Sequence, residues 1–150
     1  MAREERAVFV NMCMIRNGEK VLVIDRQKKD WPGITFPGGH VEKAESFVEA
    51  VIREVREETG LTIEDPMLCG TKQFQTESDA RYVVLFYKAT RFSGTLKASD
   101  EGEVFWIDRK DLTNYPLSLD MEAMVQVMES EKLSEFYYSQ ENGDWKYTLL

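Results

Sequence analysis

The stretch FPGGHVEKAESFVEAVIREVREETGL, residues 36–61, decides the fold of this chain. Its second half predicts an amphipathic helix from about Ser46 to Thr59. Ser46 suits the N-cap position, because Glu49 follows three residues later as in a capping box. Gly60 suits the left-handed C-cap, where glycine meets no steric penalty. The helix is therefore defined at both ends by its own residues.

The apolar side chains of this helix gather on one side of a helical wheel. We expect that side to pack on a β-sheet, and its members are Phe47, Val48, Val51, Ile52 and Val55. Glu54 and Glu58 lie on the shoulder of the apolar side, and Glu57 lies just outside it. Because residues three and four apart are neighbours on a helix, the three carboxylates share one side.

Three effects make this carboxylate cluster unfavourable. Like charges repel at these spacings, the helix dipole disfavours anions near the C-terminus, and partial burial adds a desolvation cost. Arg53 can reach Glu57, but negative charge remains in excess. A hard divalent cation such as Mg²⁺ is an economical partner, because it binds carboxylate oxygens and keeps substrate phosphates as further ligands. The alternative interpretation is a solvated acidic face.

Pro37, Gly38 and Gly39 form the loop directly before the helix. Glycine lets the backbone approach a ligand closely and adopt unusual dihedral angles. A plain turn is the alternative interpretation of the two glycines taken alone.

Upstream of this stretch, a β-hairpin is predicted. Residues 7–15 and 20–25 are apolar and β-branched, and Asn17-Gly18 lies between them as a turn signal. Residues 26–38 are polar and contain two prolines, so we expect a loop there.

Downstream, strands and one further helix are predicted, and the tail can form a closing hairpin around Asn142-Gly143. The expected strands are residues 67–75, residues 81–92 and a short segment from Glu103, and the expected helix is residues 118–130. This order predicts an α/β (α+β) sandwich in which helices pack on a mixed sheet.

The composition limits the class of protein. A chain of 150 residues suits one domain spanning residues 1–150. The net charge of -8 and the pI of about 4.8 argue against binding to nucleic acid or to a membrane surface, because both are polyanionic. They do not argue against a small anionic ligand that enters with a cation.

Individual residue counts exclude several site types. Cys13 and Cys69 sit in apolar runs and read as free thiols. His40 is the only histidine, which argues against a His-based zinc site. The first apolar run is too short for a membrane span and lacks a cleavage site after it. We expect a cytoplasmic monomer or homodimer.

The stretch from Gly39 resembles the signature of the Nudix hydrolase superfamily, G-x5-E-x7-R-E-U-x-E-E-x-G-U, where U is apolar. Every specified position matches over 23 residues: Gly39, Glu45, Arg53, Glu54, Val55, Glu57, Glu58, Gly60 and Leu61. The resemblance implies a Nudix-like α/β/α sandwich with a mixed β-sheet. It also implies Mg²⁺-dependent, or Mn²⁺-dependent, cleavage of a nucleoside diphosphate linked to another group.

The resemblance also implies roles for single residues of the signature. Glu54, Glu57 and Glu58 would bind the metal, and Glu54 is also a candidate base for the attacking water. Arg53 would orient the glutamates, and Glu45 would brace the loop against the helix. Such chemistry fits a chain with one histidine, because metal-bound water needs no serine or histidine nucleophile.

Other candidates lie outside the helix. The carbonyl of Gly38 would be a further metal ligand, and Glu101, in an acidic turn, would supply an extra acid. A solvated turn is the alternative for Glu101. Gly39 and His40 lie at the mouth of the expected site, where a phosphate contact and a solvent-facing loop are both open for His40. Trp31, Phe36, Phe74 and Tyr82 are candidates for stacking on a base, with core or loop packing as the alternative for each.

The expected substrate is a nucleoside triphosphate, as in the MutT-type members that release a monophosphate and pyrophosphate. An oxidised substrate such as 8-oxo-dGTP is included in this expectation. Position 77 is Glu, so the proline typical of ADP-sugar pyrophosphatases is missing there, and so is the tyrosine typical of dinucleoside polyphosphate hydrolases. Those two activities, a non-catalytic nucleotide-sensing module and an RNA 5′-end hydrolase remain as alternatives.

Overall fold

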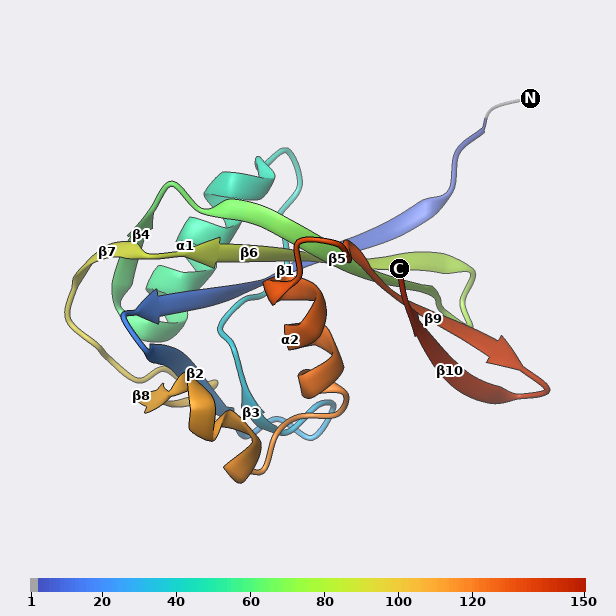
Figure 1. Cartoon of the computed structure of the whole chain (residues 1–150). Helices are drawn as coiled ribbons and strands as arrows, with labels where there is room; N and C mark the ends of the chain where they lie inside the picture. The colour runs from blue at the N-terminus through green and yellow to red at the C-terminus, as the bar shows by residue number, and fades with distance from the viewer. Residues whose placement is uncertain (1–2) are drawn as a thin grey trace.

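The computed structural model describes residues 3–150, which form a curled mixed sheet with a helix on each side (Figure 1). The strands are β1 (Arg6–Asn17), β2 (Lys20–Arg26), β3 (Gly33–Thr35), β4 (Leu61–Glu64), β5 (Met67–Gln75), β6 (Ala80–Ala89), β7 (Arg91–Gly94), β8 (Gly102–Asp108), β9 (Glu135–Glu141) and β10 (Asp144–Leu149). The helices are α1 (Phe47–Thr59), α2 (Met121–Glu129) and a short 3-10 helix, Arg109–Asn114.

The main sheet has the strand order β10-β9-β5-β6-β1-β2-β3, and β8 pairs with β2. Strands β1 and β6 run parallel over ten residue pairs, from Arg6 opposite Ala80 to Ile15 opposite Ala89. Strands β5 and β9 also run parallel, whereas the other pairs are antiparallel. Strands β4 and β7 form a separate two-stranded sheet. The mixed sheet predicted from the sequence is confirmed.

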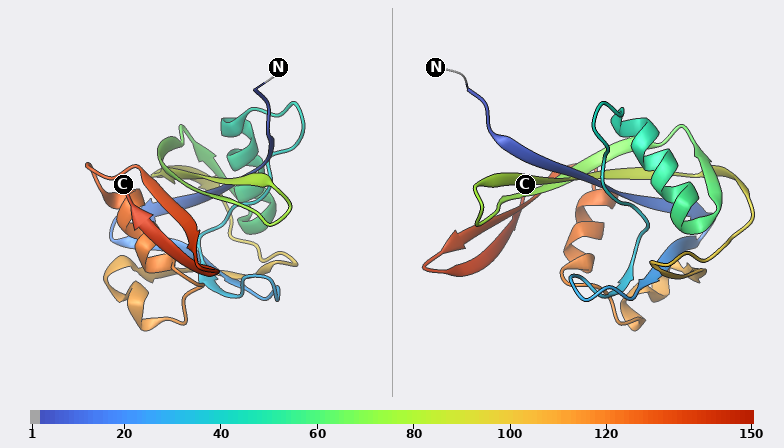
Figure 2. Two further views of the ribbon diagram at one scale, coloured as in Figure 1. Left: turned by 90° about the vertical axis from the view of Figure 1, so that its right-hand side faces the viewer. Right: turned by 180° about the vertical axis from the view of Figure 1, so that it is seen from behind.

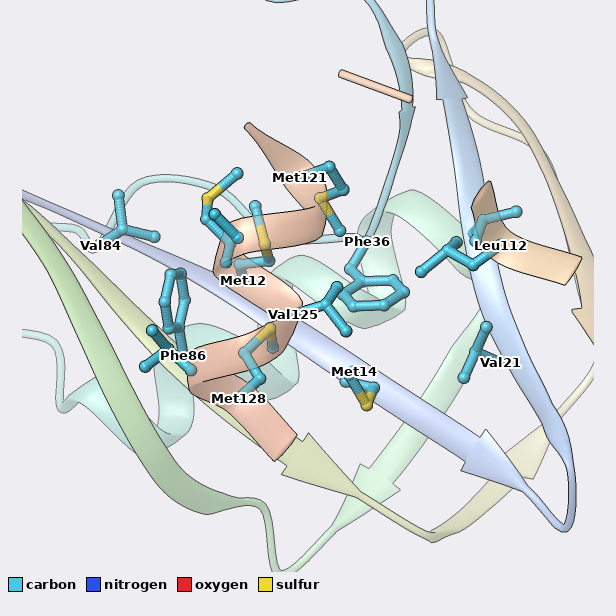
Figure 3. Close-up of a cluster of buried hydrophobic side chains, with 14 of the residues drawn as sticks. Met12, Met14, Val21, Phe36, Val84, Phe86, Leu112, Met121, Val125 and Met128 are labelled. Atoms are coloured by element: carbon cyan, nitrogen blue, oxygen red, sulfur yellow. The ribbon is translucent and has the colours of Figure 1, made fainter. Parts of the chain in front are cut away.

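Alternation along the central strands builds two cores, because successive side chains of a strand point to opposite faces. On β1, Met12 and Met14 enter one core, whereas Cys13 and Ile15 enter the other. The first core packs against α2 and is drawn in Figure 3; its labelled residues are Met12, Met14, Val21, Phe36, Val84, Phe86, Leu112, Met121, Val125 and Met128.

The second core packs against α1. Val51 and Val55 of the helix meet Leu61 and Ile63 of β4, together with Leu85 of β6. Helices α1 and α2 therefore cover opposite faces of the central strands (Figure 2), which is the predicted α/β/α arrangement.

The helix ends agree with the prediction for residues 46–59. The Ser46 Oγ accepts a hydrogen bond from the Glu49 N–H at 3.0 Å, and Gly60 adopts φ 81° as the left-handed C-cap. The first turn differs from the prediction, because Phe47 and Val48 are exposed. The buried side of the helix instead includes Glu58, which was expected only at the edge of the apolar side.

Several strand predictions need correction. The first hairpin turns at Gly18-Glu19, one residue later than expected, since Asn17 pairs with Lys20. The predicted loop 26–38 contains β3, because residues 33–35 pair antiparallel with the end of β2. Ile34 also forms backbone hydrogen bonds with the distant residues Pro116 and Ser118. A strand of three residues carries little alternation, so the sequence gives only a weak local signal for it.

The predicted strand 81–92 is divided in two. Strand β6 ends at Ala89, and the chain then enters β7 to pair with β4, which was not predicted. In β4, Leu61 and Ile63 are buried and belong to the core that packs against α1.

The tail forms the closing hairpin β9–β10, which extends away from the rest of the sheet in Figure 1. Both cysteines are free, and burial raises the pKa of each thiol. Between residues 3 and 150, no helix has the length and apolar character that a membrane crossing requires.

Candidate active site

The glycine loop before α1 is attached to β1 as though it were a further strand. The Cys13 N–H donates to the Pro37 carbonyl at 2.8 Å, and the Asn11 N–H donates to the Gly39 carbonyl at 2.8 Å. The Asn11 side chain adds a third bond, because its Oδ1 accepts from the Gly39 N–H at 3.1 Å. The loop is therefore positioned mainly by backbone atoms of the central strand.

Close approach requires glycine at position 38, where the neighbour is backbone, whereas at position 39 the neighbour is a carboxylate that can move. A Cβ on Gly38 would overlap the Asn11 carbonyl, and a Cβ on Gly39 would overlap the Glu54 carboxylate. The Gly38 N–H points away from β1 and donates to the Glu58 carboxylate at 3.4 Å. The carbonyl of Gly38 accepts no hydrogen bond from residues 3–150, so it is free for another partner.

Arg53 connects the loop to the carboxylates of α1. Its Nε and Nη2 donate to both oxygens of Glu45, at 2.7 and 3.0 Å, which is the strong bidentate geometry. Its Nη1 lies 3.0 Å from Glu54 and 3.2 Å from Glu57. Its Nη2 also donates to the His40 carbonyl at 2.9 Å. The bracing role of Glu45 and the orienting role of Arg53 stay predictions, and these contacts are the ones through which such roles would act.

The charges of this network shift several pKa values. Hydrogen bonds from Arg53 lower the pKa of Glu45 to about 2. Burial raises the pKa of Glu54, although its bonds to Arg53 act in the opposite direction. Glu54 is therefore a carboxylate with a weaker preference for the charged form than an exposed glutamate.

Glu58 is the most buried of the three helix carboxylates, at 8 % exposure. Burial raises its pKa to about 8, and the hydrogen bond from Gly38 only partly offsets this effect. Glu58 has no ion pair with any of residues 3–150. A buried carboxylate without a cation is costly, so this position fits a ligand that brings positive charge.

Glu57 differs from its two neighbours. Its side chain is 57 % exposed, and it does not line the pocket next to Glu54 and Glu58. Across residues 3–150, no three acidic, histidine or cysteine side chains stand close enough together to form a ready-made metal site. The metal-binding roles of Glu54, Glu57 and Glu58 thus remain predictions.

The donor types nevertheless fit a hard divalent cation, which prefers carboxylate and carbonyl oxygens. Glu54 and Glu58 face the same pocket as Gly38 and Glu101. Arg53 Nη1 contacts one oxygen of Glu54 and one oxygen of Glu57.

Glu101 is already paired with two cations. Lys28 Nζ lies 2.6 Å from its carboxylate, and Arg26 Nη1 lies 3.4 Å from it. This pairing raises the pKa of Lys28. Arg26 and Lys28 also line the pocket, so cations and carboxylates face each other there.

These groups surround a pocket of about 490 Å³. We call one part the acid end, formed by Gly38, Gly39, Glu54, Glu58 and Glu101. We call the other part the aromatic end, formed by Trp31, Lys72, Phe74 and Tyr82. Phe74 and Tyr82 stack with their ring centroids 5.2 Å apart.

The predicted substrate contacts all line this pocket, in different settings. His40 is exposed, Trp31 is half-buried, and Phe36 is 2 % exposed and belongs also to the core next to α2. For Phe36, core packing is therefore a large part of its role.

Sequence reasoning missed Asn11, Arg26, Lys28 and Lys72. Asn11 interrupts a buried apolar strand, and that interruption was the available signal. Its Nδ2 is the one buried side-chain nitrogen or oxygen in residues 3–150 without a hydrogen-bond partner. Lys72 left no signal, since a lysine within a polar segment such as TKQFQ is ordinary.

Comparison with known proteins supports a single family. The family model described as NUDIX domain matches residues 5–128. The ADP-ribose pyrophosphatase of Methanocaldococcus jannaschii is 34 % identical over 75 % of this chain and 68 % of that protein. The CTP pyrophosphohydrolase of Escherichia coli is 31 % identical over 75 % of this chain and 84 % of that protein.

Among solved structures, the mutator MutT protein of Bacillus halodurans is similar with a TM-score of 0.75. It is 28 % identical, and the match covers 95 % of this chain and 97 % of that one. The similarity therefore includes the sheet and both helices, and not only the stretch around α1.

Proposed function

The chain belongs to the Nudix hydrolases, and on that premise we propose that it is a divalent-metal-dependent pyrophosphohydrolase of nucleoside triphosphates. Its products would be a nucleoside monophosphate and pyrophosphate. One observation carries the proposal: Glu58 is buried without a cation at the acid end, directly opposite the glycine loop. A buried carboxylate that is costly without a cation is suited to one that arrives with an anionic substrate.

The proposed ligands are Glu54, Glu57, Glu58, the Gly38 carbonyl and Glu101. The metal, Mg²⁺ or Mn²⁺, would neutralise charge on the phosphate oxygens and lower the pKa of bound water. The carboxylates would hold the metal ion at one place. Gly38 and Gly39 carry no side chains, so the loop leaves room for phosphate oxygens.

Glu54 is proposed as the base. Water attacks the α- or the β-phosphorus of the triphosphate, and its proton moves to a Glu54 oxygen. The bond from that phosphorus to the oxygen bridging the α- and β-phosphates breaks, which gives the monophosphate and pyrophosphate. A base works best when its pKa lies near the working pH, and burial raises the pKa of Glu54. Arg53 holds the Glu54 carboxylate through Nη1 and so fixes its direction.

Cleavage of a nucleoside diphosphate linked to a sugar is the second candidate, supported by the similarity to an ADP-ribose pyrophosphatase. The missing proline near position 77 argues against it. A nucleotide-sensing module without turnover is less favoured, because every specified position of the signature is intact.

The test is release of phosphate and of pyrophosphate, with Mg²⁺ and with EDTA. The panel contains ordinary and oxidised nucleoside triphosphates, ADP-ribose and diadenosine polyphosphates. We expect metal-dependent pyrophosphate release from a triphosphate. Turnover of ADP-ribose alone would favour the second candidate, and nucleotide binding without any turnover would favour the sensing module.

A further inference from the structure

Lys72 projects from β5 onto the face of the sheet that α2 covers. It lies opposite Val84 on β6 and opposite Phe136 on β9. Val84 and Phe136 both belong to the core on that face, so the position is one where an apolar side chain would be ordinary. Lys72 instead places an ammonium group at the wall of the pocket.

Three aromatic rings surround this ammonium group. The Lys72 Nζ lies 4.9 Å from the ring centroid of Tyr138, 5.3 Å from that of Phe136 and 5.8 Å from that of Trp31. These distances fall in the range of cation–π attraction. Burial nevertheless lowers the pKa of Lys72 to about 8, and the negative charge of Asp120 offsets only part of that effect.

The N–H donors of the Lys72 ammonium group meet no hydrogen-bond acceptor among the described residues. Within residues 3–150, Lys72 makes no hydrogen bond and no ion pair, although an ammonium carries three N–H donors. Ring faces attract the charge but do not replace strong hydrogen-bond acceptors. Lys72 lines the pocket, so its N–H donors can be taken up there by water or by a ligand oxygen.

The register places Lys72 across the sheet from the glycine loop. Lys72 pairs with Val84, Val84 with Val10, and Val10 forms a bridge with His40 of the loop. Three strand spacings separate Lys72 from His40, which is roughly 14 Å along the row. A nucleotide whose phosphates occupy the acid end would therefore extend its base toward Lys72.

We propose that Lys72 selects the base of the substrate by donating a hydrogen bond to an exocyclic carbonyl oxygen. The preferred substrates are nucleotides with a keto group at that edge of the base: guanine, hypoxanthine, uracil and thymine. Adenine and cytosine present an amino donor at the same position, and two donors facing each other repel. This inference rests on the proposed nucleotide function and adds its substrate class.

Phe74 and Tyr82 complete the proposed base site. Their stacked rings lie on the same face of β5 and β6 as Lys72, and both line the pocket. An aromatic surface accepts any base, because every base has a flat face. Stacking thus supplies affinity without discrimination, and the Lys72 donor supplies the choice between keto and amino bases.

The decisive experiment compares ITP with ATP, which differ at position 6 of the purine. Equilibrium binding of each nucleotide is measured with the whole protein and Ca²⁺ in place of Mg²⁺, to limit turnover. We expect the wild type to bind ITP about tenfold more tightly than ATP. Lys72→Met should reduce that ratio to near one by weakening ITP binding. Lys72→Gln, which can donate or accept, should give an intermediate ratio.

Lys146→Met is the matched control, because Lys146 is an exposed lysine of β10 paired with Glu141. It should leave the ratio unchanged. The inference is overturned if Lys72→Met keeps the wild-type ratio, if both nucleotides weaken equally, or if the wild type binds neither. An equal loss would indicate a phosphate contact.

The proposed function is judged separately, by Mg²⁺-dependent hydrolysis of ITP. Selective binding of ITP without hydrolysis would refute the catalytic proposal and leave the base selection by Lys72 intact. If both nucleotides are hydrolysed and Lys72→Met does not change the ratio of the two rates, the catalytic proposal stands and base selection by Lys72 is refuted.

Discussion

The two ends of the pocket are built in different ways. Apart from Glu101, the acid end comes from one continuous stretch, in which a glycine loop and the helix after it bring Gly38 and Gly39 against Glu54 and Glu58. The aromatic end comes from a loop and two strands that are distant in sequence. A site formed by one stretch can be recognised from residue spacing, whereas a site formed by strand register requires the fold.

The ends also differ in how they manage charge. At the acid end, repulsion among carboxylates is offset by Arg53, with one arginine reaching several acids. At the aromatic end, a single ammonium group has only ring faces around it. We therefore expect changes at the acid end to affect the chemical step, and changes at the aromatic end to affect which substrate binds.

The largest expected effect is on turnover at the acid end. Glu54→Gln should lower kcat by about 10²–10⁴-fold, because the base is lost, with the fold retained. Glu57→Gln should also abolish most activity if the exposed Glu57 turns toward the metal. Pyrophosphate release with Mg²⁺ measures both, and Glu64→Gln, an exposed acid of β4, is the control. Full activity of either site variant would contradict the role of that residue.

The next effect concerns stability and pH. The pKa of Glu58 is raised to about 8, so the folded protein disfavours its charged form. In the metal-free protein, the free energy of unfolding should therefore fall by on the order of 3 kcal/mol as pH rises from about 4.5 to 8. Glu58→Gln should remove this component.

Urea unfolding in EDTA at pH 5 and pH 8 measures the Glu58 effect. The difference between the two pH values is compared for wild type and variant, again with Glu64→Gln as the control. An identical pH dependence in wild type and Glu58→Gln would show that the buried carboxylate does not destabilise the empty site.

A smaller effect is expected for Arg53→Ala, about 1–3 kcal/mol in the free energy of unfolding. The lowered pKa of Glu45 contributes stability that is present above about pH 4.5 and is lost as pH falls toward 2. The variant should lack this acid-dependent loss. Arg56→Ala, which removes an exposed arginine of the same helix, should behave like wild type in acid denaturation.

The smallest expected effect is a gain in stability, whereas most substitutions lower the free energy of unfolding. Lys72→Met should raise the free energy of unfolding by about 1–2 kcal/mol near pH 7, because it removes a partly buried charge. The gain should shrink between about pH 8 and 10.5, where the wild-type lysine loses its charge in the folded and then in the unfolded state. Thermal unfolding of Lys72→Met beside Lys146→Met measures it, and a destabilised Lys72→Met would identify the side chain as structural.

The predictability of the fold follows the same division. Helix α1, its caps and the first hairpin depend on local residues such as Ser46 and Gly60, and they were predicted closely. Strand β3 has only three residues, which pair with β2 and bond through Ile34 to a segment some 80 residues away in sequence, and β7 depends on pairing with β4. Neither carries a strong local pattern, so both were missed.

In the site, spacing predicted that Glu54 and Glu58 share one side, but not how deeply Glu58 is buried. The reason is the first turn of α1, where Phe47 and Val48 are exposed and the buried side is rotated toward the acids. Lys72 could not be assigned from the sequence, because its role depends on which strands flank β5.

The attachment of residues 37–39 to β1 has a consequence for how such an enzyme can diversify. The backbone bonds from Asn11 and Cys13 use atoms that every non-proline residue possesses, so they survive exchange of nearly any neighbouring side chain. Residues 37–39, next to the proposed reaction centre, thus stay attached to the central strand β1. If the aromatic end binds the base as proposed, substitutions on β5 and β6, two and one strands away, can change the base preference without moving residues 37–39.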